Sequence, residues 1–366
     1  MKRAVAVLAA AFCVAAVAPA AASAATVPKD FYGVVSQGEL APYDAYLMQQ
    51  AGVETLRFHF DWRNIQPQPG RCQAAAELGV CDWRIIDYGV GLMAAAGVRA
   101  FPFFLNVPWF VDEDSNAPPI HSKEDRLAWQ GFLAAAVQRY GKGGEYWKRY
   151  FPSQFPGYRA RPVTHWEVWN EPSDGSYWRP KPDAGEYARL LELSGRAIHR
   201  EQPSADVVFA GLFGTPTEDN NGIKAFNFYR KAFARPGIGK YFDDVGVHPY
   251  GPTLKRVQTQ MGWVLEEMKN AGFADRDIWI TEIAWSSSEP PTILGVGPEG
   301  QARLLTQSFG LFKRMREEWN IAGLHWYAWQ DLESQRLCEF CYEAGLVRFD
   351  RSQKPAYEAF KAIAAK

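Results

Sequence analysis

Two glutamates of the chain stand where strands are expected to end, and carboxyl groups placed in that way can exchange protons with a ligand. Glu171 closes the segment 164–172, which reads Thr-His-Trp-Glu-Val-Trp-Asn-Glu-Pro. Pro172 cannot donate a ladder hydrogen bond and keeps the preceding residue extended, so strand pairing should stop near Glu171. Asn170 and Glu171 are therefore expected at the carboxyl end of a strand, where parallel α/β proteins build their sites.

The residues before this corner alternate in the manner of a strand. Trp166 and Val168 should point to one face, and Glu167 and Trp169 to the other, because a strand has a side-chain period of two. Glu167 lies four residues before Glu171. We therefore expect Glu167 deeper in the structure, in a structural role.

Strand-like and helix-like segments alternate along the rest of the chain. The predicted strands are 31–36, 53–62, 98–107, 164–171, 206–212, 242–247, 277–284 and 321–329. The predicted helices are 42–51, 82–97, 122–140, 184–201, 223–234, 254–270, 299–318 and 355–365. Eight strand–helix units with right-handed crossovers predict a single (β/α)₈ barrel over residues 25–366. The alternative is an open doubly wound sheet, but the Gly-x-Gly-x-x-Gly turn of its dinucleotide-binding form is absent.

In such a barrel the carboxyl ends of all eight strands face one mouth. The polar and aromatic residues expected there are Arg57, His59, Asn106, Trp109, Asn170, Glu171, His248, Tyr250, Glu282, Trp326 and Trp329. Glu171 and Glu282 would stand on the fourth and seventh strands, facing each other across the mouth. Glycoside cleavage requires a pair of this kind, since one acid protonates the leaving oxygen while the other carboxylate attacks the sugar or activates water.

The motifs at these strand ends resemble those of the clan A glycoside hydrolases, with features of families 5 and 39. The matching residues are Trp-Asn-Glu-Pro at 169–172, Ile-Thr-Glu at 280–282, Arg57, and the Trp-rich eighth strand. The resemblance covers nearly the whole chain after residue 24, and it implies a retaining (β/α)₈ hydrolase that uses no metal and no organic cofactor.

The resemblance also implies a role for each matching residue. Glu171 would be the general acid/base and Glu282 the nucleophile, with Asn170 hydrogen-bonded to the sugar 2-hydroxyl. Arg57 and Tyr250 would hold the Glu282 carboxylate ionised. The remaining expected site residues, which would shape the sugar subsites, are His248, Trp326 and Trp329. Strand alternation cannot give Trp326 and Trp329, three residues apart, the same orientation unless a bulge or a chain turn intervenes. We expect Trp326 to be the sugar platform and Trp329 to lie in a neighbouring subsite, and which of the two faces the mouth stays open at this stage.

The first 24 residues have the order of a secretory signal peptide: a basic start, an apolar Ala/Val/Leu segment and Ala22-Ser23-Ala24. We expect cleavage after Ala24 and a secreted or extracytoplasmic protein without a membrane span. The formal charge is −1 for the whole chain and becomes about −3 without Lys2 and Arg3. A charge of this size does not suggest a nucleic-acid partner, and nothing in the sequence specifies an oligomer.

Four cysteines remain after cleavage: Cys72, Cys81, Cys338 and Cys341. In an exported protein an even number favours disulfides, and the local pairs would be Cys72–Cys81 and Cys338–Cys341. A zinc site is the rival interpretation, since Cys338-x-x-Cys341 has metal-ligand spacing.

The expected partner of the protein is a carbohydrate, and aromatic residues, which make up 14% of the chain, suit sugar rings. Two other functions use the same residues. A transglycosylase would pass the sugar to an acceptor sugar in place of water, and a barrel that has lost its chemistry would only bind glycans. The sugar, the linkage, and endo or exo action stay open at this stage.

Overall fold

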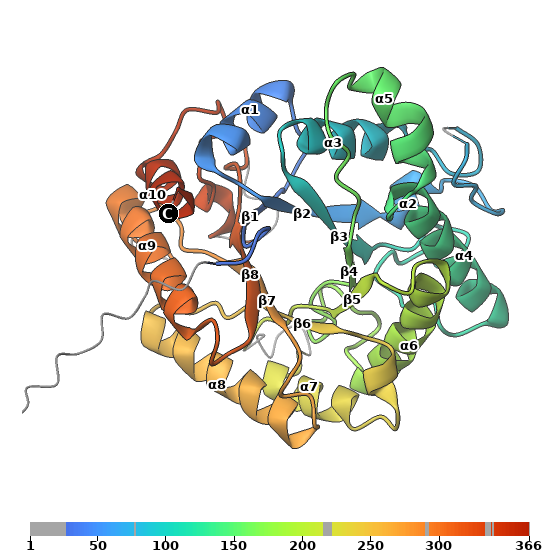
Figure 1. The fold of residues 1–366 in the computed structure, drawn as a ribbon. Coiled ribbons are helices and arrows are strands. Elements are labelled where there is room, and N and C mark those ends of the chain that lie inside the picture. The colour runs from blue at the N-terminus through green and yellow to red at the C-terminus, as the bar shows by residue number, and fades with distance from the viewer. Residues whose placement is uncertain are drawn as a thin grey trace, which may run out of the picture.

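The computed structural model describes residues 27–76, 78–214, 222–289, 293–333, 338 and 340–365. The predicted signal peptide, residues 1–24, lies outside them. Eight parallel strands form a closed barrel in chain order, with β8 paired to β1 (Figure 1). The strands are β1 Tyr32–Val35, β2 Thr55–Asp61, β3 Arg99–Leu105, β4 His165–Val168, β5 Asp206–Phe209, β6 Asp244–Val247, β7 Ile278–Ile283 and β8 Ile321–Tyr327. The predicted (β/α)₈ barrel is confirmed.

Helices surround the barrel between consecutive strands. They are α1 Pro42–Ala51, α2 Trp62–Ile65, α3 Arg84–Ala95, α4 Lys123–Tyr140, α5 Phe151–Gln154, α6 Ala184–Glu201, α7 Ala225–Phe233, α8 Leu254–Asn270, α9 Gly297–Met315 and α10 Pro355–Ala364, with short turns at Tyr146–Tyr150, Ile238–Lys240 and Cys341–Glu343. The predicted start of α4 is correct, because Ser122 and Asp125 form a capping box. None of the described helices is long and apolar enough to cross a membrane.

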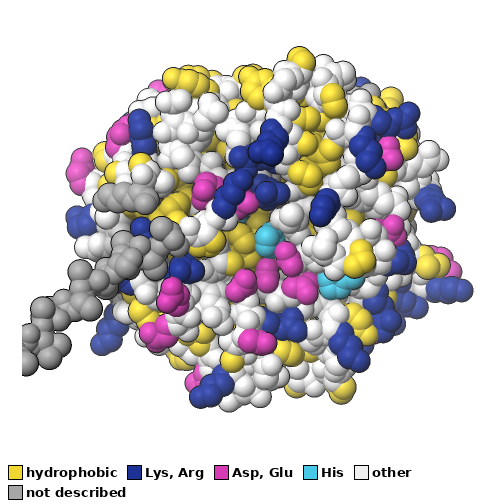
Figure 2. All heavy atoms as spheres, viewed as in Figure 1, with side chains coloured by type: hydrophobic (Ala, Val, Ile, Leu, Met, Phe, Trp, Pro, Cys, Tyr) yellow, Lys and Arg dark blue, Asp and Glu magenta, His cyan; other side chains and the backbone are white. Residues whose placement is uncertain are grey.

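The strands follow one another clockwise in Figure 1. Right-handed crossovers appear clockwise only when the viewer looks at the amino ends of the strands. Figures 1 and 2 therefore show the amino-terminal face of the barrel, and the mouth formed by the carboxyl ends lies on the far side.

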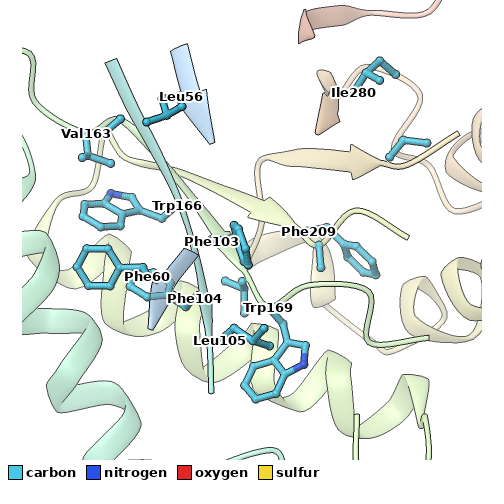
Figure 3. Close-up of a cluster of buried hydrophobic side chains, with 14 of the residues drawn as sticks. Leu56, Phe60, Phe103, Phe104, Leu105, Val163, Trp166, Trp169, Phe209 and Ile280 are labelled. Atoms are coloured by element: carbon cyan, nitrogen blue, oxygen red, sulfur yellow. The ribbon is translucent and has the colours of Figure 1, made fainter. Parts of the chain in front are cut away.

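Alternation along the strands divides the side chains between the barrel interior and the helices. On β2, Phe60 points outward, where its ring lies 5.3 Å from Phe104 of β3 and 5.9 Å from Phe132 of α4 (Figure 3). Trp166 of β4 stacks on Phe104 at 5.6 Å in the same layer. This aromatic layer between β2–β4 and α4 fixes the positions of the strands that carry Arg57 and Glu171.

The fourth strand ends earlier than the sequence predicts. Regular pairing stops at Val168, and both Trp169 (φ 77°) and Glu171 (φ 42°) have left-handed backbone conformations. The prediction that Trp169 shares a face with Glu167 is therefore wrong. Trp169 packs outside the barrel against Trp178, while Glu167 points inward and is fully buried.

Both local cysteine pairs are joined. Cys72–Cys81 and Cys338–Cys341 are disulfides, each with a Cα–Cα distance of 5.2 Å. The local pairing is confirmed, and the zinc interpretation of Cys338 and Cys341 is wrong because their sulfurs are bonded to each other.

Candidate active site

The floor of the mouth is organised by a fully buried cation. Arg57 donates from Nε to Glu167 (2.6 Å), from one terminal nitrogen to Glu282 Oε1 (2.6 Å), and from the other to Asn170 Oδ1 (2.8 Å). Its guanidinium also lies 4.1 Å from the centre of the Phe103 ring. The carboxylates keep the pKa of Arg57 above its ordinary value, so the side chain stays charged. Arg57 thus pairs with the predicted site acid Glu282 rather than with Asp61.

Glu282 reaches the mouth because β7 is irregular at that point. Trp279 lies inside the barrel beside Phe101, so strict alternation would turn Glu282 toward the helices. The pairing of β7 with β8 changes register between Ile280 and Ile283, and an irregularity of this kind re-aims side chains. Glu282 Oε2 then accepts a hydrogen bond of 2.8 Å from the Tyr250 hydroxyl.

Burial keeps Tyr250 in the form that donates. The pKa of this phenol is raised well above its ordinary value by burial and by the Glu282 charge, so the hydroxyl retains its proton. Glu282 therefore accepts hydrogen bonds from two donors, Arg57 at Oε1 and Tyr250 at Oε2.

Glu171 has the opposite surroundings. Its carboxyl is largely buried, and burial together with the charge of Asp174 raises its pKa to about 8, against the lowering effect of Arg57. Oε1 lies 2.7 Å from His248 Nδ1. Burial lowers the pKa of His248 to about 4, so the imidazole is neutral near pH 7 and offers Glu171 no positive charge. Glu171 is thus held as the protonated acid.

The two carboxyl groups lie close enough to act on the two atoms of one bond in a ligand. One oxygen of Glu171, one oxygen of Glu282 and a ring nitrogen of His248 all lie within 4.8 Å of one another. These three side chains are the one group in the described part of the chain with donor spacing suited to a metal ion. Arg57, at 2.6 Å from Glu282, already supplies the positive charge there and would repel a second cation.

The structure brings six of the eight predicted site residues together: Arg57, Asn170, Glu171, His248, Tyr250 and Glu282. It does not bring Trp326 to them. Trp326 is fully buried, its ring lies near Trp285 and Phe309 of α9, and its Nε1 donates to Ala344 O. A ring with no exposed face cannot stack on a sugar, so the predicted platform is misplaced.

Trp329 is also remote from the carboxyl pair. Its Nε1 donates to Asp44, its ring packs near Tyr357 of α10, and only 1% of the residue is exposed. It lies in the wall of a separate hollow that Gln37 and Asp331 also line. Any ligand contact made by Trp329 would therefore lie away from Glu171 and Glu282.

Three aromatic residues that the sequence interpretation missed stand at the carboxyl pair. Tyr327 lies 6.4 Å from Tyr250, and Phe340 lies 5.2 Å from Tyr250 and 6.3 Å from Tyr327, between ring centres. Burial and the charges of both glutamates raise the pKa values of Tyr177 and Tyr327, which places both phenols near the pair. The sequence feature that could have identified Tyr327 is His325. A histidine that faces the barrel interior places residue 327, two positions further along the strand, on the same face.

Comparison with known proteins rests on structure. No protein-family model matches the chain, and no curated protein sequence matches it. Solved structures match over nearly all of the chain. A family 39 glycoside hydrolase from Bacteroides cellulosilyticus WH2 is 20% identical with a TM-score of 0.62, covering 93% of this chain and 64% of that protein. The chain thus spans slightly less than two thirds of that enzyme.

Two further structures have the same fold. A monomeric β-xylosidase from Caulobacter crescentus CB15 is 17% identical with a TM-score of 0.64, covering 93% of this chain and 69% of that one. An endo-β-1,4-mannanase from Thermotoga petrophila is 12% identical with a TM-score of 0.57, covering 92% of this chain and 76% of that one. The chain therefore shares its barrel fold with these solved glycoside hydrolases.

Proposed function

We propose that the protein is an extracytoplasmic retaining glycoside hydrolase that cleaves O-glycosidic, β-linked bonds of an oligo- or polysaccharide. The observation that carries the proposal is the pair Glu171 and Glu282, with oxygens within 4.8 Å and opposite electrostatic surroundings. Retaining enzymes hold their carboxyl groups about 5 Å apart, whereas inverting enzymes leave room for a water molecule between them.

In the first step, a Glu282 oxygen attacks the anomeric carbon while the bond to the leaving oxygen breaks. Glu171 gives its proton to that oxygen, which departs as an alcohol. Arg57 and Tyr250 hold the attacking carboxylate of Glu282 in place by hydrogen bonds to its two oxygens. The raised pKa of Glu171, about 8, keeps the proton available near neutral pH.

In the second step, the ionised Glu171 takes a proton from water as the water oxygen bonds to the anomeric carbon. The ester bond to Glu282 breaks, so the sugar leaves with its original configuration and both carboxyl groups return to their starting state. Asn170 has its oxygen held by Arg57, so its amide NH₂ is the group it would offer to the sugar 2-hydroxyl.

Other features support the setting of this activity. The predicted signal peptide and the two disulfides suit an oxidising compartment. Tyr177, Tyr327 and Phe340 supply the aromatic surface for a sugar ring that Trp326 was expected to supply. The fold shared with a β-xylosidase and an endo-β-1,4-mannanase makes β-xylosides, β-mannosides and the corresponding polysaccharides the first substrates to screen.

The test is kinetic analysis of Glu171→Gln and Glu282→Gln on an alkyl or phenyl β-glycoside that the wild type cleaves, because a poor leaving group of this kind departs only with a proton. Each variant should lose at least about 10³-fold in kcat/KM, because the acid or the nucleophile is absent. Thermal unfolding of each variant serves as the control for folding. Activity near that of the wild type in either variant contradicts the proposal.

Azide separates the two roles. Added azide should rescue Glu171→Ala and give a glycosyl azide of retained configuration, because the small anion attacks the Glu282 ester in place of activated water. With Glu282→Ala the azide product should be inverted.

Product analysis at high acceptor-sugar concentration distinguishes hydrolysis from transglycosylation.

A further inference from the structure

The disulfide Cys338–Cys341 lies next to the aromatic wall of the candidate active site. It closes a segment of four residues, and Phe340 lies inside that segment. The Phe340 ring is partly buried, with its centre 5.2 Å from the Tyr250 ring and 6.3 Å from the Tyr327 ring. Phe340 is therefore the residue between the two cysteines whose ring lies against Tyr250 and Tyr327.

Two connections lead from this segment to the reacting groups. The first runs through Phe340 to Tyr250, whose hydroxyl donates to Glu282 Oε2 at 2.8 Å. The second is polar: Gln37 donates from Nε2 to Cys341 O (3.3 Å) and accepts at Oε1 from the Tyr327 hydroxyl (2.8 Å). The segment thus contacts Tyr250, which is bonded to Glu282, and is linked through Gln37 to Tyr327.

The chain after Cys341 is anchored independently of the disulfide. Ser287 N donates to Glu343 O (2.9 Å), and Gln301 Nε2 donates to Ala344 O (3.1 Å). Cys341 itself is 6% exposed and donates from its backbone to Cys338 Sγ (3.1 Å). The disulfide therefore ties residue 338 to a fixed base and limits the positions that Phe340 can take between them.

We propose that the Cys338–Cys341 disulfide and Phe340 form a positioning element for Glu282. The disulfide holds Phe340 against Tyr250, and this contact keeps the Tyr250 hydroxyl on the Glu282 carboxylate. Opening the ring lets Phe340 move away, so Tyr250 gains freedom and the charged Glu282 loses part of its hydrogen bonding. This inference rests on the proposed hydrolase function.

The experiment compares two disulfide-free variants of the full chain. Cys338→Ser/Cys341→Ser should lower kcat/KM on an aryl β-glycoside about 10-fold and move the acid limb of the kcat/KM–pH profile upward by about half a unit. Cys72→Ser/Cys81→Ser is the matched control, because that disulfide closes a loop between β2 and α3 and its Cys72 Sγ lies near Gln66. The control should lose thermal stability but keep the wild-type pH profile.

Variants of Phe340 and Tyr250 test the route of the effect. Phe340→Ala should reproduce the shift of the acid limb. Phe340→Leu should bring the pH profile most of the way back to that of the wild type, because leucine fills most of the same space. In a Tyr250→Phe background, Phe340→Ala should cause no further shift, because both changes act through one hydrogen bond. Additive effects, or a profile that neither Phe340→Ala nor the opened disulfide changes, overturn the inference.

A crystal structure of Cys338→Ser/Cys341→Ser provides a readout that needs no activity. The distance from Tyr250 Oη to Glu282 Oε2, 2.8 Å in the intact protein, should lengthen or the Tyr250 ring should show alternative positions. An unchanged Tyr250 in that crystal overturns the positioning role. If the wild type cleaves no glycoside, the proposed function fails while the crystal structure still decides the positioning role.

Discussion

At the scale of single residues, Glu171 and Glu282 are the same amino acid made different by their neighbours. Glu282 receives hydrogen bonds from Arg57 and Tyr250, both of which stabilise negative charge. Glu171 is buried beside a neutral His248, and Asp174 adds a repelling charge. Two carboxyl groups whose surroundings push their ionisation apart are the usual arrangement for an acid and a nucleophile in one site.

The first prediction concerns the pH dependence of activity. The pKa of Glu171 is raised to about 8, so kcat/KM for a glycoside with a poor leaving group should fall tenfold per pH unit above about pH 8. The sign follows from the need for a protonated acid, which is lost as pH rises through this value. The measurement is kcat/KM from pH 5 to pH 10 on an alkyl or phenyl glycoside.

A dinitrophenyl glycoside supplies the control for this profile. Its leaving group departs without protonation, so the alkaline limb should disappear from the formation of the glycosyl–Glu282 ester. On the substrate with the poor leaving group, the residual activity of Glu171→Gln should likewise lack the alkaline limb. An alkaline limb that stays in place in both experiments means that another group titrates there.

The second prediction separates Tyr327 from Trp326. Tyr327→Ala should lower kcat/KM about 10- to 100-fold, because the ring near Tyr250 and Phe340 is lost from the mouth. Trp326→Phe should lower the free energy of unfolding by about 1–3 kcal/mol, since it leaves a gap between Trp285 and Phe309, and should keep kcat/KM within about threefold. Kinetics and thermal unfolding of both variants provide the comparison, and a reversed pattern would restore Trp326 as the platform.

At the scale of elements, alternation predicted the barrel but not every side-chain direction. Helix α8 occupies 254–270 as predicted, because its caps and apolar spacing are local properties of the sequence. The directions of Glu282 and Trp169 depend on a register shift in β7 and on a left-handed residue after β4. Both features arise from packing between distant strands, so a period of two read from one segment cannot reveal them.

Close approach of strands also explains a glycine of β6. A Cβ at Gly246 would lie 2.7 Å from Gly211 N and 2.8 Å from Phe209 O, both rigid backbone atoms. Gly246→Ala should therefore lower the free energy of unfolding by about 1–3 kcal/mol and reduce activity, because Gly211 and His248 would shift. Gly262→Ala on α8, where a Cβ meets nothing within 4 Å, is the control and should be neutral or slightly stabilising. Equal melting temperatures for both variants would contradict the close approach.

At the scale of the whole molecule, ionisable groups collect at both ends of the barrel. The mouth holds the carboxyl pair and Arg57. At the amino-terminal face, acidic and histidine side chains gather near the centre (Figure 2). The ionisable groups there are His165, His199, Asp206, Asp243, Asp244 and Asp277. Among the described residues of these two groups, Arg57 at the mouth is fully buried beside Glu167 and Glu282, whereas Arg99 at the amino-terminal face is partly exposed.

The amino-terminal face should control part of the pH dependence of stability. Burial and the charges of Asp206 and Asp277 raise the pKa of Asp244 to about 8, although Trp279 Nε1 donates to it. The folded-state pKa lies above the unfolded value of about 4, so folding favours the protonated form. The contribution of protonated Asp244 to the free energy of unfolding is therefore complete below about pH 4 and is lost as the pH rises toward 8.

Asp244→Asn should remove the loss of folding stability at high pH. The amide has the shape of the protonated acid, and its oxygen can still accept the hydrogen bond from Trp279 Nε1. At pH 9 the variant should be more stable than the wild type by on the order of 2–5 kcal/mol, and at pH 4 the two should be nearly equal. Asp275→Asn, an exposed neighbour, is the control for a change of net charge. Thermal unfolding at both pH values measures the difference. A gain that is the same at pH 4 and pH 9, or equal to that of Asp275→Asn, would show that protonation of Asp244 does not contribute to folding.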